Sequence, residues 1–191
     1  MYYLLMAAVI AGLDQAFKYW VVANIAERGY FELLPGFMHL TFIKNTGASF
    51  SILEGQRWLL LGITVVALVL LVWFIFKSDC TRWERVCLAS VMGGAVGNAI
   101  DRVLFGYVVD MFEVEFVRFA VFNVADCFIV CGGILFCILY IIRTVKEEKD
   151  KKSPGCMPEL KRLAEKRVSA EQTADSSAEE VKDENTDNGS A

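Results

Sequence analysis

Four long apolar stretches dominate the sequence and limit what it can fold into. They cover about residues 2–25, 58–76, 86–105 and 121–142. A helix needs about 20 predominantly apolar residues to cross the hydrocarbon core of a bilayer, so each stretch is long enough, or nearly long enough, to span a membrane. We therefore predict an all-α membrane bundle of four transmembrane helices.

The charged residues are largely separated from these stretches. Hydrophobic residues make up 55% of the chain, which is too high for an ordinary soluble domain. From Arg143 onward, however, the sequence is charged and polar. We predict a membrane domain over residues 1–145 and a charged, largely disordered tail over residues 146–191. Within the tail, residues 158–171 have the spacing of an amphipathic helix.

Basic residues beside the stretches predict the orientation of the chain. The segment between the second and third stretches contains Lys77, Arg82 and Arg85. The segment after the fourth stretch begins with five basic residues: Arg143, Lys146, Lys149, Lys151 and Lys152. Basic segments next to membrane helices stay in the cytoplasm. Both termini should then be cytoplasmic, and residues 26–57 and 106–120 should form loops on the outer side.

Both outer loops contain short alternating patterns of polar and apolar residues. Residues 39–44 and 112–116 alternate in this way, and Pro35-Gly36 has the composition of a turn before the first of them. A period of two is typical of β-strands. We expect a small extracytoplasmic sheet or flap that lies on the outer surface of the membrane.

The cysteines and the single histidine argue against a metal centre. The six cysteines show no CxxC spacing, and His39 is the only histidine. A zinc site needs clustered ligands, and cysteine in a membrane helix usually acts as a small apolar residue. We therefore expect no metal, no cofactor and no disulfide framework. The chain also lacks a basic face with interleaved aromatic residues, so we expect no nucleic-acid partner.

Polar groups within or beside the apolar stretches are the candidates for function, because they are costly in a membrane. They gather toward the predicted outer side: Asp14, Lys18, Asn98, Asp101, Arg102, Asp110, Asn123 and Asp126. Some have structural explanations. Asp14 and Lys18, four residues apart on one helix face, can form an ion pair. Asp101 and Arg102 can mark the membrane boundary, and the amides of Asn98 and Asn123 can join helices. The two aspartates at 110 and 126 have no basic partner nearby in sequence, which makes them a candidate pair.

Gly93, Gly94 and Gly97 place small residues along the third stretch. Small residues let membrane helices pack closely against one another. They can also leave room for a peptide substrate beside the helix. The sequence alone is compatible with both uses.

Three functions stay open from the residues alone. Two carboxylates can form the active site of an aspartyl protease. Buried carboxylates can also relay protons through a transport protein, although such a relay should continue toward the cytoplasm. Alternatively, the polar residues can hold together a non-catalytic membrane scaffold. A scaffold should tolerate aspartate-to-asparagine changes, since an amide still forms hydrogen bonds.

Five short motifs resemble those of lipoprotein signal peptidase (signal peptidase II), in the order in which that family has them. Residues 93–102 resemble a family signature, and residues 108–110 and 122–126 look like its two catalytic motifs. Residues 14–18 and 45–50 are similar to its two N-terminal motifs. The Gly-x-Gly-Asp signature of presenilin-type membrane aspartyl proteases is missing from the sequence.

The resemblance implies an aspartyl endopeptidase of the bacterial cytoplasmic membrane, with its active site toward the extracytoplasmic side. Such an enzyme removes the signal peptide from diacylglyceryl-modified prolipoproteins and cuts just before the lipidated cysteine. Its expected partners are these substrates, the membrane lipids and inhibitors of the globomycin type.

The family's functional positions are matched residue by residue. Asp110 and Asp126 match the catalytic pair. The supporting positions are matched by nine residues: Asp14, Lys18, Asn45, Gly47, Asn98, Asp101, Arg102, Asn123 and Ala125. We expect Asn98 and Arg102 to position the substrate backbone, and the segment around Asn45 to clamp the substrate against the helices.

Two positions depart from the family pattern. Met111 stands where the family usually has Phe, and Ser51 closes a motif that more often ends in Gly. Neither departure removes a charged or amide group, so the expected chemistry is unaffected. One carboxylate would take a proton from water, and the other would donate a proton to the scissile carbonyl oxygen.

Overall fold

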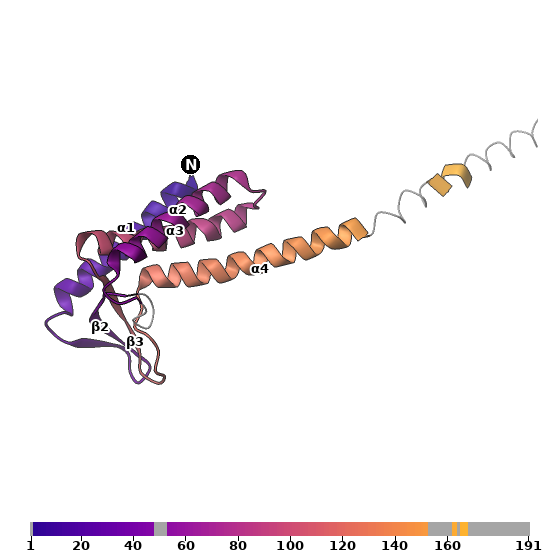
Figure 1. The fold of residues 1–191 in the computed structure, drawn as a ribbon. Helices are drawn as coiled ribbons and strands as arrows, with labels where there is room; N and C mark the ends of the chain where they lie inside the picture. The colour runs from indigo at the N-terminus through magenta and orange to yellow at the C-terminus, as the bar shows by residue number, and fades with distance from the viewer. Residues whose placement is uncertain (1, 48–52, 153–161, 164, 168–191) are drawn as a thin grey trace, which may run out of the picture. The chain divides into compact units, whose positions relative to one another are not determined.

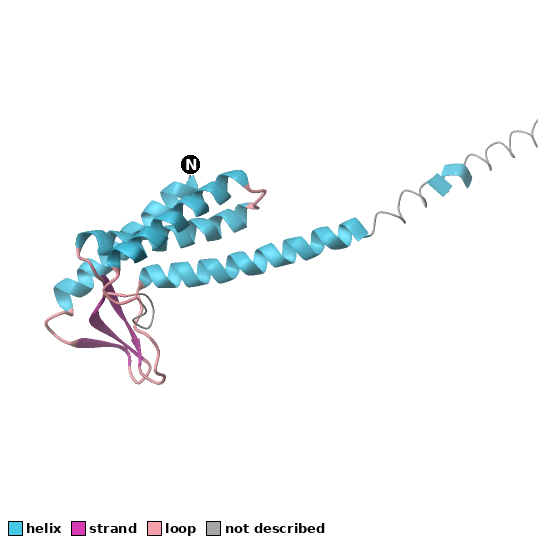
Figure 2. Ribbon diagram, in the orientation of Figure 1, coloured by secondary structure: helices cyan, strands magenta, loops and turns pink. Residues whose placement is uncertain are grey.

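The computed structural model describes residues 2–47, 53–152, 162–163 and 165–167, and it consists of helices with a small sheet (Figure 1, Figure 2). The elements in chain order are α1 (Tyr2–Asn24), β1 (Tyr30–Leu34), β2 (Met38–Asn45), α2 (Arg57–Lys77), α3 (Arg82–Leu104), β3 (Val108–Val114) and α4 (Val124–Lys152). The chain divides into two compact units, Met1–Ile141 and Ile142–Ala191. The first unit contains the sheet and most of the helical structure.

The first two helices agree closely with the predicted spans. The stretches predicted at residues 2–25 and 58–76 are α1 and α2 almost residue for residue. The third helix, α3, begins at Arg82 rather than at residue 86, because Thr81 caps it. The Thr81 hydroxyl accepts a hydrogen bond from the Glu84 backbone N–H, and the Glu84 carboxylate accepts one from the Thr81 backbone N–H.

Three of the described helices are long and apolar enough to cross a membrane: α1, α2 and the Val124–Lys149 part of α4. Most of the α2 surface is apolar and exposed, with only Leu60 and Ile75 buried, as expected for a helix that faces lipid. The helix α3 has 23 residues, but it contains more charged and small residues and does not meet this criterion. Its crossing of the membrane therefore stays a prediction.

The fourth predicted span differs from the observed helix at both ends. Its start shifts from residue 121 to Val124, because Phe122 still pairs with Phe112 in an isolated β-bridge. At the other end α4 continues past the predicted boundary at residue 142, as far as Lys152. The charged residues in this part of α4 have good helix propensity and favour its continuation. Arg143 and Glu147, four residues apart in α4, also form an ion pair at 3.5 Å. The amphipathic helix predicted at residues 158–171 lies largely outside the described residues.

The predicted sheet is present, with one strand more than the sequence indicated. Its order is β1-β2-β3, and both pairs are antiparallel. The strand predicted at residues 39–44 lies within β2, and Gly36 adopts a positive φ of 70° in the turn before it, as expected for Pro35-Gly36. The sequence did not reveal β1, because its residues show no alternation and all are exposed.

Close helix packing explains the glycines of α3. A Cβ atom on Gly93 would lie 2.8 Å from the Ala7 carbonyl oxygen of α1, and one on Gly97 would lie 2.6 Å from Oδ2 of Asp14. On the other side, a Cβ on Gly94 would collide with the Ala125 carbonyl of α4. These glycines therefore serve helix contacts, and they leave no room for a substrate at those points.

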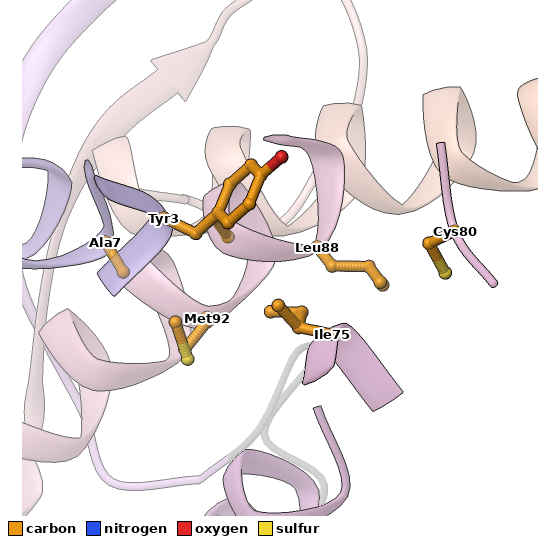
Figure 3. Close-up of a cluster of buried hydrophobic side chains, with 7 residues drawn as sticks. Tyr3, Ala7, Ile75, Cys80, Leu88 and Met92 are labelled. Carbon is orange, nitrogen blue, oxygen red and sulfur yellow. The ribbon is translucent and has the colours of Figure 1, made fainter. Parts of the chain in front are cut away.

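Two apolar clusters stabilise the first unit. One joins α1, α2 and α3 and appears in Figure 3; it consists of Tyr3, Ala7, Ile75, Cys80, Leu88, Ala89 and Met92. The other packs the sheet against the end of α1; it consists of Val21, Ile25, Leu40, Val109 and Met111. Met111, the departure from the family pattern, is completely buried in this second cluster. The sheet is thus fixed where α1 and α3 end and α2 and α4 begin (Figure 1).

Candidate active site

Asp110 and Asp126 lie on the wall of one cavity of about 510 Å³. Its other polar wall residues include Asn45, Asn98 and Arg102. Asp110 comes from β3 and is 2% exposed, whereas Asp126 comes from the first turn of α4 and is partly exposed. Two carboxylates from different elements, β3 and α4, therefore line the same half-open cavity.

Amide side chains join the two carboxylates. Nδ2 of Asn123 donates to Oδ1 of Asp110 at 2.6 Å and to Oδ1 of Asn98 at 3.1 Å. Nδ2 of Asn98 in turn donates to Oδ1 of Asp126 at 2.8 Å. On the other side of the pair, Nδ2 of Asn45 donates to Oδ2 of Asp110 at 2.8 Å. The carboxylates thus share one hydrogen-bonded chain that runs through two buried asparagines.

Local structure explains the spacing of Asn123 and Asp126. The Asp126 backbone N–H donates to Oδ1 of Asn123 at 2.9 Å, and the Asn123 backbone N–H donates to Oδ2 of Asp126 at 3.1 Å. This reciprocal pair has the geometry of a capping box at the start of α4. The cap fixes both side chains at the N-terminal end of α4, where Asn123 contacts Asp110 of β3.

The segment after β2 is tied to the same site. The Gly47 backbone N–H donates to Oδ1 of Asn45 at 2.9 Å, and Arg102 Nη2 donates to the Gly47 carbonyl at 3.2 Å. Asn45 therefore contacts both Asp110 and the backbone two residues farther along the chain. Residues 48–52, which include the predicted motif end at Ser51, lie outside the described residues.

A buried ion cluster lies next to the amides. Lys18 Nζ is 2.8 Å from Oδ2 of Asp14 and 3.0 Å from Oδ2 of Asp101, and all three side chains are at most 3% exposed. Lys18 also donates to Oδ1 of Asn98 at 2.8 Å. The ion pair predicted between residues 14 and 18 is confirmed. Asp101 is also paired, because it is buried within this cluster rather than exposed on the surface of the bundle.

Burial changes the acidity of Asp110. Loss of water around the carboxylate raises the pKa of Asp110 to about 6, and the nearby charge of Asp126 acts in the same direction. The hydrogen bonds from Asn45 and Asn123 oppose this rise, since they stabilise the ionised form. The net effect brings the titration of this carboxyl close to neutral pH.

All the residues predicted for the site are connected by hydrogen bonds or ion pairs in the structure, with Ala125 contributing its backbone N–H to Asp14 at 2.9 Å. One further participant was not predicted. Gln15 Nε2 donates to Oδ1 of Asp101 at 2.8 Å and to the Gly97 carbonyl at 3.0 Å. The sequence did contain an indication of this role, since Gln15 directly follows Asp14 within the first motif.

Comparisons with known proteins agree with one another. A family model described as signal peptidase (SPase) II matches residues 6–142. A lipoprotein signal peptidase of Enterococcus faecalis is 43% identical over 153 residues, which cover 79% of this chain and 94% of the relative. One from Lactococcus lactis subsp. lactis is 40% identical over 146 residues, which cover 75% and 96%. A solved structure described as a bacterial membrane enzyme superposes with a TM-score of 0.68 at 34% identity, covering 79% of this chain and 92% of that one.

Proposed function

The chain belongs to the signal peptidase II family, and we propose that it removes the signal peptide from diacylglyceryl-modified prolipoproteins, cutting just before the lipidated cysteine. The family consists of membrane aspartic peptidases, so the chain is a hydrolase of this kind. We assign catalysis to Asp110 and Asp126. The observation that carries this assignment is the amide chain that joins the two carboxylates on the wall of one cavity.

The two carboxylates have different roles in hydrolysis. Because the pKa of Asp110 is raised to about 6, the pair retains one proton at a pH where isolated carboxyl groups are fully ionised. The ionised carboxylate takes a proton from a water molecule, whose oxygen attacks the scissile carbonyl. The protonated carboxyl donates its proton to the carbonyl oxygen. The proton taken from water is then passed to the amine that leaves when the C–N bond breaks.

The pH dependence of cleavage should follow the shared proton. The Asp110 carboxyl, whose pKa is raised to about 6, loses its proton as the pH rises through that value, so the proton needed for the proposed mechanism is then lost. We expect kcat/KM to fall above about pH 6, approaching a tenfold loss per pH unit. Bound substrate excludes water from Asp110, so the fall in kcat should lie at higher pH. Initial rates across the pH range in one detergent measure both profiles; a kcat/KM that stays level well above pH 6 would contradict the shared proton.

Two cavities that adjoin at Asp110 suit the two parts of the substrate. The cavity of about 510 Å³ includes Ala95, Ile129 and Val130 from α3 and α4, and this apolar wall suits the signal peptide. A second cavity of about 860 Å³ lies between β2, the end of β3 and residues 115–121, outside the helices. We assign it to the first residues of the mature chain. The scissile bond then lies between the two cavities, beside the catalytic pair.

Arg102 and Asn98 remain our candidates for positioning the substrate backbone. Arg102 lines the apolar cavity and holds the Gly47 carbonyl, so its guanidinium lies between α3 and the segment after Asn45. That contact also supports a role for the Asn45 segment as a clamp. Globomycin-type peptides would compete with the substrate for the same cavity.

The proposed arrangement in the bacterial inner membrane has four crossings, with α3 as the fourth. A 23-residue helix between two membrane helices, with Asp101 paired to Lys18 inside the bundle, is long enough to cross. Both termini are then cytoplasmic, and the sheet and the active site lie on the outer side. We also propose residues 1–145 as the peptidase domain and residues 146–191 as a cytoplasmic tail. The family match, which ends at residue 142, supports this division.

The test of this function is cleavage of a diacylglyceryl-modified prolipoprotein by the purified full-length protein in lipid. We expect one cut, immediately before the modified cysteine, as identified by the mass of the released peptide. A prolipoprotein with the same sequence but no diacylglyceryl group serves as the matched control and should stay intact. Failure to cut the modified substrate, or equal cutting of both, would contradict the proposed substrate class.

A further inference from the structure

Each proposed catalytic aspartate directly follows a residue whose backbone is held by a buried carboxylate. The Val109 N–H, next to Asp110, donates to Oδ2 of Asp101 at 2.9 Å. The Ala125 N–H, next to Asp126, donates to Oδ1 of Asp14 at 2.9 Å. The two attachments are equivalent, although one lies at a strand and the other at the start of a helix.

A single lysine connects these two attachments. Lys18 contacts the carboxylates of both Asp14 and Asp101, and its third hydrogen bond goes to Asn98, which holds Asp126. An ammonium group has three N–H donors, and here each has a partner. The position of Lys18 is thus fixed in three directions by groups that lead to the catalytic pair.

The cluster has little freedom to move. Both oxygens of Asp14 are occupied, one by the Ala125 N–H and one by Lys18. The close approach of Gly97 blocks movement of the Asp14 carboxylate toward α3. The oxygens of Asp101 are likewise occupied. Oδ1 accepts from Gln15, and Oδ2 accepts from Lys18 and from the Val109 backbone N–H.

We propose that Asp14, Lys18 and Asp101 form a spacer that sets the separation of the catalytic carboxylates Asp110 and Asp126. These three are positioning residues, and the inference rests on the proposed function of the pair. Because a bound water must reach one carboxylate while the carbonyl oxygen reaches the other, small changes in their separation reduce the rate of the chemical step. A buried ion cluster attached to both backbones keeps that distance constant.

The decisive variant removes the spacer without leaving unpaired charges. Asp14→Asn, Lys18→Met and Asp101→Asn together are electrically neutral, and both asparagines can still accept the backbone N–H groups. We expect this triple variant to fold, to keep KM within about threefold of wild type, and to lose at least about tenfold in kcat, since a displacement near 1 Å can cost about 10²-fold. A folded triple variant with the wild-type kcat would overturn the proposal.

Single variants decide the question if the triple variant does not fold. Asp14→Asn and Asp101→Asn each leave one carboxylate paired with Lys18, and each should lower kcat with KM unchanged; wild-type kcat in both would also overturn the spacer. Ser90→Ala is the matched control, because it removes a 3.2 Å hydrogen bond to the Phe128 carbonyl between α3 and α4 but touches no member of the cluster. We expect this control to keep the wild-type kcat. An equal loss of kcat in the control would show that the cluster only stabilises the fold in general, which would contradict the proposal.

The outcomes separate this proposal from the function on which it rests. If the wild-type protein cuts the modified prolipoprotein and the catalytic variants do not, the function stands whatever the spacer variants do. If the wild-type protein does not cut, the function itself fails.

Discussion

Asp110→Asn and Asp126→Asn should each reduce cleavage by about 10²–10⁴-fold while leaving the protein folded. Asparagine has nearly the shape of aspartate and keeps an oxygen that can accept the hydrogen bond from Asn123 or Asn98. It cannot take a proton from water or donate one to a carbonyl oxygen. Each variant also loses the hydrogen bond to the second carboxylate oxygen, which comes from Asn45 in one case and from the Asn123 backbone N–H in the other. We expect this to lower stability modestly, so the fold is maintained while the proton transfers are lost.

The measurement is a single-turnover assay with excess enzyme, in which the signal-peptide product is quantified by mass. Unfolding temperatures in the same detergent check that the variants are folded. Asp79→Asn, the same chemical change in the connection between α2 and α3, is the matched control and should cut at the wild-type rate. Near-normal cleavage by either active-site variant would show that the substituted aspartate is not catalytic and has only a structural role, since an amide would then replace the carboxylate without loss.

The parts of this protein that the sequence predicted are those with a local signal. The spans were visible because apolar residues must cover a helix that faces lipid, and α2 matches its predicted range closely. The relation between Asn123 and Asp126 is also local, since a cap joins residues three positions apart. For α4 the same reasoning failed at the C-terminal end, because a helix does not have to stop where its apolar residues stop.

The hydrogen bonds that connect different elements within the site had no local signal in the sequence. Asp14 binds the backbone of Ala125, and a backbone N–H is the same group in every residue except proline. No pattern of side chains can therefore indicate which N–H a buried carboxylate will meet across the bundle. The spacing of Asp14 and Lys18 predicted their ion pair, but only the structure reveals that Asp101 joins this pair and that the cluster is connected to both catalytic motifs.

Lys18→Met alone should be strongly destabilising, by about 3–5 kcal/mol. Methionine is close to lysine in length and is apolar, so the change creates little empty space. It leaves the carboxylates of Asp14 and Asp101 buried without a cation, at 0% and 1% exposure. Removing one partner of a buried ion pair costs more than removing the whole pair, because the remaining charge has neither water nor a counterion.

Denaturant or thermal unfolding in detergent measures this loss, and the neutral triple variant is its natural comparison. Adding Asp14→Asn and Asp101→Asn to Lys18→Met should restore most of the stability, since no unpaired charge then remains. A Lys18→Met protein as stable as wild type would contradict the ion pairing on which this expectation rests. Recovery of stability without recovery of kcat would show that Lys18 has two separate effects. It balances charge within the bundle, and it holds the two halves of the active site at a working distance.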